Sequence, residues 1–103
     1  MNKNAQPSIK QLRAIGHKLK PVVTVAGNGL SDAVTSEIDR ALNDHELIKI
    51  KLAVGDRQNR QAVTEEMCRL SDAKVIQQVG NVVLLLRRTT SPDPKKSNLI
   101  RPL

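Results

Sequence analysis

The sequence predicts an α/β fold, a two-layer sandwich with the element order αβαβαββ and a mixed four-stranded sheet. Three amphipathic segments, with apolar residues at three- or four-residue steps, alternate with short segments rich in Val, Ile and Leu. Strands separated by a helical crossover pair in parallel. The pair Gly80-Asn81 between the last two apolar segments predicts a hairpin, which adds antiparallel pairing to the sheet.

The first helix is predicted over residues 9–19. Ser8 and Gln11 stand at capping-box spacing, and apolar residues then recur on one face at Ile9, Leu12, Ile15 and Leu19. Pro21 ends the segment, because the residue before a proline is biased away from helix. The β-branched run Val22–Ala26 that follows predicts a buried strand.

The second helix follows the turn Gly27-Asn28-Gly29, with Ser31 as its N-cap and its end near Asp44-His45. Its inner face is predicted to comprise Val34, Ile38, Ala41 and Leu42. Residues 47–53 then alternate between apolar and polar, which predicts a strand with one solvent-facing side.

The third helix is predicted after Gly55, with Asp56 as its N-cap and with inner positions Ala62, Val63, Met67 and Leu70. Strands over residues 74–79 and 82–87 complete the sheet. If most helices pack on one face, the other face stays partly wet, and its candidates are Lys49, Lys51, one of Gln77 or Gln78, and Arg87. The alternative is that these lysines only protect a sheet edge.

The chain of 103 residues is long enough for one domain. We expect a flexible N-terminus over residues 1–7, a folded domain over 8–88 and a basic, mobile tail over 89–103. Leu99, Ile100 and Leu103 leave docking of that tail open.

The charge is concentrated at the two ends of the chain. The formal net charge is +7, yet residues 21–88 contain equal numbers of bases and acids. Residues 1–20 contain five bases and no acid, and residues 89–103 contain Lys95, Lys96 and Arg101 against Asp93. An excess of this kind favours a polyanionic partner, either nucleic acid or an anionic membrane, over a charge that only maintains solubility.

Several classes of function are disfavoured by what the chain lacks. It has no Phe, Tyr or Trp, which excludes RNA recognition by aromatic stacking and removes the aromatic anchor of a membrane-surface helix. His, Cys and Asp residues do not occur together at the spacing of metal ligands. His45 stands between two acids, but it is more simply explained by its position at the C-terminus of the second helix, where a histidine is favourable. We therefore expect no enzyme, no cofactor, no metal, no small-molecule substrate and no membrane partner.

The cellular compartment follows from two features. The polar first seven residues do not resemble a secretory signal, and the single Cys68 cannot form an internal disulfide. Both fit a cytoplasmic protein, which we expect to be a monomer.

The strongest local feature is the glycine turn between the first strand and the second helix. Glycines allow a ligand to approach the backbone closely, and the N-terminus of a helix favours an anion. The spacing is not that of a P-loop or a dinucleotide-binding turn. Lys10, Arg13, His17 and Lys20 form a basic stripe on the helix before it, which makes phosphate the expected ligand.

Five segments together resemble a known family: Leu19-Lys20-Pro21-Val22-Val23, Asn28-Gly29-Leu30-Ser31, His45-Glu46-Leu47-Ile48-Lys49-Ile50-Lys51, Val79-Gly80-Asn81 and Leu85-Leu86-Arg87. In this order and spacing they resemble the YhbY-type bacterial members of the CRM domain family, over about residues 8–88. The resemblance implies a fold like the C-terminal domain of translation initiation factor three. It also implies RNA binding through a GxxG loop and association with precursors of the large ribosomal subunit.

Carried over by position, the GxxG loop falls on Ala26, Gly27, Asn28 and Gly29. The chain departs from the family at Ala26, where the first glycine is expected, and at Leu86, where the family often has Tyr. The backbone freedom has either moved to Gly27 or the loop binds RNA less closely.

The leading hypothesis is an RNA-binding assembly factor that contacts structured ribosomal RNA, from the large subunit or its precursor particles, through phosphates and 2′-hydroxyls. Its candidate RNA-binding residues are Lys10, Arg13, Lys18, Lys20, Ala26, Gly27, Asn28, Gly29, Lys49, Lys51, Arg87 and Arg88. The alternative is a protein-interaction module whose basic ends dock an acidic partner, and a third possibility is DNA binding.

Overall fold

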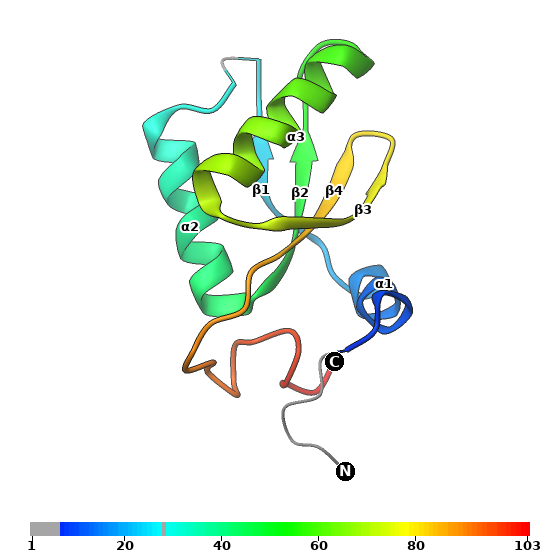
Figure 1. Cartoon of the computed structure of the whole chain (residues 1–103), viewed down its shortest axis with the longest axis vertical. Helices are drawn as coiled ribbons and strands as arrows, with labels where there is room; N and C mark the ends of the chain where they lie inside the picture. Colours follow the sequence, from blue (N-terminus) through cyan, green and yellow to red (C-terminus); the bar gives the residue numbers. More distant parts are fainter. Residues whose placement is uncertain (1–6, 28) are drawn as a thin grey trace.

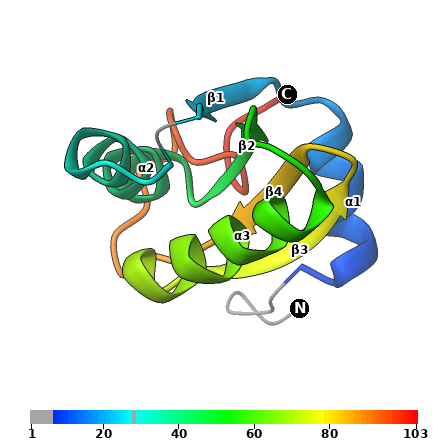
Figure 2. The ribbon, with the colours of Figure 1, turned by 90° about the horizontal axis from the view of Figure 1, so that it is seen from above.

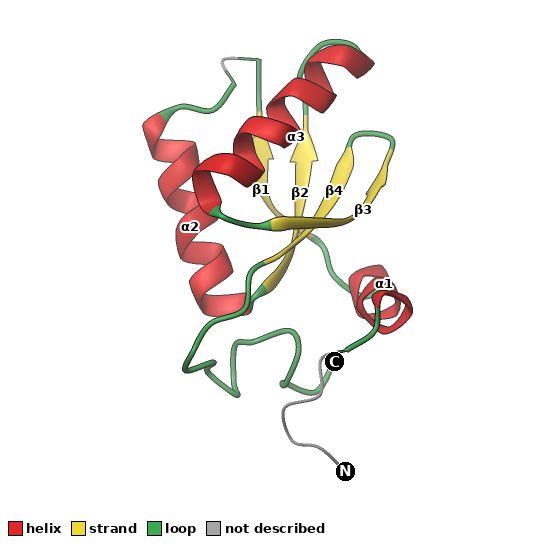
Figure 3. Cartoon of the chain, in the orientation of Figure 1, coloured by secondary structure: helices red, strands yellow, loops and turns green. Residues whose placement is uncertain are grey.

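The computed structural model describes residues 7–27 and 29–103, and it confirms the α/β class and the element order (Figure 3). The elements are α1 (Ile9–His17), β1 (Pro21–Val25), α2 (Asp32–His45), β2 (Leu47–Leu52), α3 (Arg57–Ser71), β3 (Lys74–Val79) and β4 (Val82–Leu86). The strands form a sheet in the order β1-β2-β4-β3. The first pair is parallel and the other two are antiparallel, so the sheet is mixed as predicted.

The predicted caps fix the start of each helix. Ser8 and Gln11 form the capping box of α1, with hydrogen bonds of 2.7 and 3.1 Å. The Ser31 hydroxyl accepts from the amide of Val34, and the Asp56 carboxylate accepts from the amide of Asn59. These caps satisfy amides in the first turn that have no partner within the helix. The end of α1 lies two residues earlier than predicted, at His17.

The helices cover the two faces of the sheet unequally. Helices α2 and α3 pack on one face over the larger apolar cluster, which includes Ile38, Leu42, Ile50, Met67 and Leu85. Helix α1 lies across one end of the opposite face, over a smaller cluster of Leu12, Leu47, Ile76 and Leu84 (Figures 1 and 2). The sandwich therefore has a short third layer, and the rest of the α1 face is open.

Gly16 allows α1 to approach the sheet closely. A Cβ at this position would lie 2.6 Å from Cδ2 of Leu84 on β4. Because Leu84 is buried beneath the helix, a larger residue here would require either the Leu84 side chain or α1 to shift.

The inner face of α3 differs from the prediction. Ala62 is exposed and Leu70 is 47% exposed, whereas Thr64 and Ser71 are buried beside Met67. The hydroxyls of Thr64 and Ser71 donate to the carbonyls of Arg60 and Met67, at 2.8 and 2.6 Å. Such bonds to the preceding turn satisfy a hydroxyl without a distant partner, so these two polar residues can take positions that the apolar pattern assigned to their neighbours.

The segment 89–103 lies docked on the domain; the sequence predicts a mobile tail but leaves docking open. It folds across the end of the sheet that α1 also covers, and the C-terminus lies near α1 (Figure 1). Ser97 and Asn98 are buried, and Leu99 packs against the cluster beneath α1. One of its anchors is Glu46, a residue that the sequence pattern does not identify as buried.

Glu46 is the C-cap of α2 and is completely buried. Its carboxylate accepts hydrogen bonds from the Ser97 hydroxyl at 2.7 Å, the Thr89 amide at 2.8 Å and Nε of Arg88 at 3.3 Å. Its φ of +61° lies in a region that favours glycine. A buried charge is stable only when its oxygens are satisfied, so this residue ties the C-terminal segment to the junction of α2 and β2.

In the part of the chain that the structure describes, none of the helices has the length and apolar character needed to cross a membrane.

Candidate nucleic-acid interface

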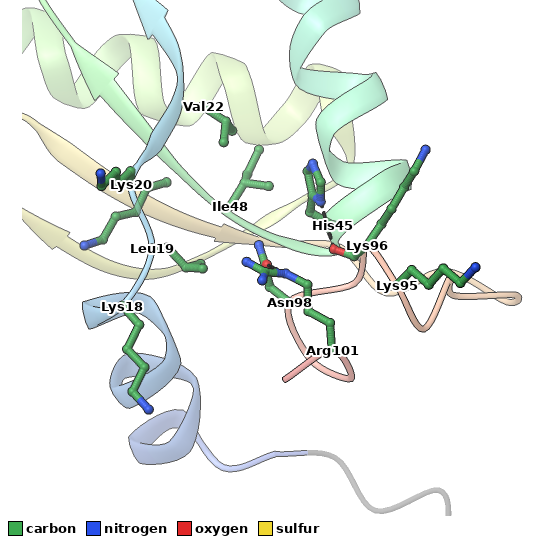
Figure 4. Close-up of a pocket in the computed structure, with 11 residues that line it drawn as sticks. Lys18, Leu19, Lys20, Val22, His45, Ile48, Lys95, Lys96, Asn98 and Arg101 are labelled. Carbon is green, nitrogen blue, oxygen red and sulfur yellow. Dashed lines mark hydrogen bonds between the residues drawn. The ribbon is translucent and has the colours of Figure 1, made fainter. Parts of the chain in front are cut away.

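A groove of about 510 Å³ lies at the end of the sheet where α1 and the C-terminal segment meet. It is lined by residues of the α1–β1 connection, the α2–β2 junction and the C-terminal segment: Lys18, Leu19, Lys20, Val22, His45, Ile48, Lys49, Lys95, Lys96, Asn98 and Arg101. Figure 4 shows Lys18 and Lys20 along one wall, Lys95 and Lys96 along the other, and Val22 and Ile48 between them.

The groove is strongly cationic. Six of its lining residues are Lys or Arg, and none is Asp or Glu. Clustered like charges in a concave surface focus the field and attract anions. Basic residues from both ends of the sequence therefore line one groove, Lys18 and Lys20 from one end and Lys95, Lys96 and Arg101 from the other.

The basic stripe of α1 leads toward this groove along the helix. Lys10, Arg13 and His17 are exposed on α1, and Lys18 caps its C-terminal end. His17 also lines a smaller depression of about 270 Å³ on the open part of the sheet, together with Lys49, Gln77, Val79, Val82 and Leu84. Lys49 lines both hollows, so the groove and the open sheet face form one continuous surface.

The open sheet face carries three of the side chains predicted for it. Lys49 pairs with Leu84, Lys51 pairs with Val82, and Gln77 also pairs with Leu84, which places all of them on the side of α1. Of the two glutamines that the sequence left as alternatives, Gln77 is the one on this face.

Arg87 lies on the opposite face, contrary to the prediction that it belongs to the wet face. Alternation along β4 places it on the side of Leu85, where α2 and α3 pack. Its guanidinium donates to Asp39 Oδ1 at 2.8 Å, to Asn43 Oδ1 at 2.9 Å and to the Ser71 carbonyl at 2.8 Å. Arg87 thereby joins α2 to the C-terminal turn of α3. Its neighbour Arg88 contacts Glu46.

The glycine turn lies at the other end of β1 from Lys20. Gly29 has a φ of +74°, and its amide donates to the carbonyl of Ala26 at 2.9 Å. Asn28 lies outside the described residues. A strand of five residues is about 16 Å long, so the turn and the groove are separate places. Of the predicted lysines, Lys51 lies nearest the turn end of the sheet, where it pairs with Thr24.

A second basic hollow, at the turn end of the sheet, is not predicted by the sequence pattern. Arg57 and Arg60 at the start of α3 line a depression of about 470 Å³ with Gln61, Gln78 and Gly80. Nothing in the apolar pattern identifies these arginines, because they occupy ordinary outward positions of a helix.

Three groove residues from the C-terminal segment, Lys95, Lys96 and Arg101, are also absent from the predicted site residues. Two features of the sequence could have identified them: the excess of basic residues over 89–103 and the apolar Leu99 in the same segment. His45 forms a hydrogen bond to the same segment. Its Nδ1 is the donor and the Lys96 carbonyl oxygen, which can only accept, lies 2.8 Å away.

The ionisable groups with shifted pKa values lie on α3, away from the groove. Burial raises the pKa of the Cys68 thiol. A hydrogen bond from Arg69 lowers the pKa of the Glu66 carboxyl, and the same bond raises the pKa of the Arg69 guanidinium. Among residues 7–27 and 29–103, no group of three or more His, Cys, Asp or Glu side chains could hold a metal ion.

Comparison with known proteins gives consistent matches. The sequence pattern of the CRS1 / YhbY (CRM) domain matches residues 6–87. The chain is 46% identical over 96 residues to "Probable RNA-binding protein PA4753" of Pseudomonas aeruginosa, which covers 93% of this chain and 92% of the relative. It is 42% identical over 76 residues to the "RNA-binding protein" of Haemophilus influenzae, covering 74% of this chain and 77% of the relative.

A solved structure matches the fold. The solution structure of the hypothetical protein SAV1595 from Staphylococcus aureus superposes with a TM-score of 0.71 at 20% identity. The match covers 84% of this chain and 93% of that chain.

Proposed function

The chain belongs to the CRS1 / YhbY (CRM) domain family, and we propose that it binds structured RNA chiefly through the phosphate backbone. The family resemblance read from the sequence is thereby confirmed. The two relatives described above are named as RNA-binding proteins and not as enzymes, which agrees with the expectation of a non-catalytic chain. The chain has no Phe, Tyr or Trp on which bases could stack, so we expect backbone and 2′-hydroxyl contacts to supply most of the affinity.

The observation that supports this proposal most directly is the distribution of basic side chains. Lys18, Lys20 and Lys49 line the groove, and Lys49 also lines the depression on the open sheet face. Lys10 and Arg13 are exposed on α1, the helix whose His17 lines that depression. Lysine acts as a flexible point charge that suits phosphates in varied positions. A surface of this kind favours polyanions without strong sequence preference.

The glycine turn is proposed as a separate contact. Gly27 is exposed, a Cβ at either glycine would meet no atom within 4 Å, and the capped N-terminus of α2 follows directly. An RNA phosphate could therefore approach the backbone amides closely. Ala26 replaces the first glycine of the family pattern. Gly29 has a positive φ, so its backbone conformation is one that favours glycine.

We further propose that the RNA belongs to the large ribosomal subunit or its precursors, and that the protein acts there as a cytoplasmic, monomeric assembly factor. The support for this step is the family resemblance, together with a surface suited to structured RNA.

The test is binding to an in vitro transcribed fragment of large-subunit rRNA, measured by fluorescence anisotropy over a range of salt concentrations. The variant Arg13→Ala/Lys20→Ala removes two exposed charges, and we expect weaker binding and a shallower dependence on salt, by about one unit of log–log slope for each phosphate that is no longer neutralised. The control Arg40→Ala/Arg69→Ala removes two exposed charges on α2 and α3, which cover the other face of the sheet. Equal affinity and equal slope for the test variant and wild type would show that this placement is wrong.

The competing hypothesis, an acidic protein partner, has its own signature. Purified protein incubated with lysate and washed at low salt without nuclease would then retain a protein and no RNA. Competition with duplex DNA of equal length tests DNA binding, because a protein that contacts 2′-hydroxyls should prefer RNA.

A further inference from the structure

We propose that the docked C-terminal segment is part of the RNA-binding surface: it supplies one wall of the cationic groove, and this groove holds a stretch of RNA phosphate backbone. This inference rests on the proposed RNA binding. It adds a site that is distinct from the glycine turn and that uses residues beyond position 87, where the match to the CRM domain ends.

The segment is held by a specific set of bonds on both sides of its basic residues. Ser97 donates to the buried Glu46 carboxylate at 2.7 Å, and the Thr89 amide donates to the same carboxylate at 2.8 Å. The amide of Asn98 donates to the His45 carbonyl at 2.9 Å, and its side-chain Nδ2 donates to the Leu47 carbonyl at 2.6 Å. These contacts give hydrogen-bond partners to polar groups at the α2–β2 junction.

Lys95 and Lys96 immediately precede this anchor. The Lys96 carbonyl accepts from His45 Nδ1, so the backbone that carries the two lysines is fixed while their side chains stay exposed (Figure 4). Arg101 follows the anchor and is oriented by a bond from its Nε to Asn98 Oδ1 at 2.7 Å. A segment docked in this way holds the backbone of its basic residues in place, which lowers the entropy that an ordered complex would lose.

The facing wall comes from the other end of the chain. Lys18 and Lys20 follow α1, and Lys49 reaches the groove from β2. Assembling six cations without an acid among the lining residues opposes folding, because the like charges repel. A polyanion relieves that repulsion, whereas an acidic peptide would need to match the walls with carboxylates at fixed spacing. A groove of about 510 Å³, with apolar Val22 and Ile48 between two basic walls, suits a continuous phosphodiester chain.

The test compares two double variants of the full chain that remove the same charge. Lys95→Ala/Lys96→Ala alters the groove wall, and Arg40→Ala/Arg69→Ala alters exposed positions on α2 and α3 outside the groove. Both are titrated against the same large-subunit rRNA fragment between about 50 and about 200 mM salt. Circular dichroism and thermal unfolding establish that both variants are folded.

We expect the groove variant to bind about tenfold more weakly and to lose between one and two units of salt slope. We expect the control to stay within about twofold of wild type. The inference is overturned if the two variants weaken binding equally, or if the groove variant binds as wild type does.

The binding of wild type separates this inference from the function on which it rests. If wild type binds the RNA and the groove variant binds equally well, the groove is wrong and the proposed function stands. If wild type fails to bind the RNA at low salt, the proposed function fails and the groove inference fails with it.

Discussion

Replacing Ser97 with alanine tests how the C-terminal segment is held. The hydroxyl of this completely buried residue donates to Glu46 Oε1 at 2.7 Å and accepts from the Leu99 amide at 3.2 Å. Ser97→Ala removes both bonds without adding atoms. A hydrogen bond to a charged group contributes about 1.5 to 3 kcal/mol, and a neutral one about 1 kcal/mol. We therefore expect the free energy of unfolding to fall by about 3 kcal/mol.

Urea denaturation followed by circular dichroism measures this loss. With a denaturant dependence of about 1.5 to 2 kcal/mol per molar urea, the midpoint should fall by about 1.5 to 2 M. If the segment detaches before the domain unfolds, the loss is instead confined to the segment. The amides of Thr89 and Asn98 should then exchange their hydrogens about a hundredfold faster while those of β2 are unchanged.

Ser36→Ala is the matched control, because Ser36 is exposed on α2, and we expect its stability to equal or slightly exceed that of wild type. The reasoning is refuted if Ser97→Ala leaves both the urea midpoint and the exchange of the Thr89 and Asn98 amides at wild-type values.

Three further outcomes are expected. Arg87→Ala should lower the free energy of unfolding by about 2 kcal/mol in urea melts, because it leaves the Ser71 carbonyl and Asn43 without this donor. The folded variant should nevertheless bind the rRNA fragment with unchanged affinity. Weaker binding at full stability would show that Arg87 contacts the RNA. Gly29→Ala should lower the free energy of unfolding by about 1 kcal/mol and weaken RNA binding, because the φ of +74° at this position disfavours any side chain. Gly27→Ala, at a position without a positive φ, should change the stability little. Equal stabilities of the two variants would contradict this difference. Burial raises the pKa of the Cys68 thiol, so less of the reactive thiolate is present near pH 8 than in free cysteine. Iodoacetamide should therefore label Cys68 more slowly than free cysteine, as followed by mass spectrometry. Labelling at the rate of free cysteine would show that the thiol is not protected.

The fold could be predicted from the sequence because its signals are local. Capping at Ser8, Ser31 and Asp56 sets the helix starts, and alternation in residues 47–52 determines which face carries Lys49 and Lys51. The inner face of α3 is harder to predict, because buried Thr64 and Ser71 are satisfied by carbonyls of their own helix, which no apolar pattern reveals.

The candidate site was only partly predictable, because it depends on contacts between distant residues. The basic side chains of α1 and β2 are identified from charge and alternation, whereas the groove requires the pairing of Glu46 with Ser97, 51 residues apart. The prediction that Arg87 lies on the wet face is wrong, because its four hydrogen bonds run to α2 and α3 across the core face. The separation of the glycine turn from the groove follows from the direction of β1, which charge alone does not reveal.

The central claim, that this chain binds structured large-subunit RNA on its basic surface, is tested most directly by ultraviolet crosslinking in cells, with the crosslinked residues and nucleotides both mapped. We expect RNA from the large ribosomal subunit or its precursors, joined to peptides that contain Lys18, Lys20 or Lys96. Crosslinks confined to peptides from the outer faces of α2 and α3, or no enrichment of large-subunit RNA over total RNA, would contradict it.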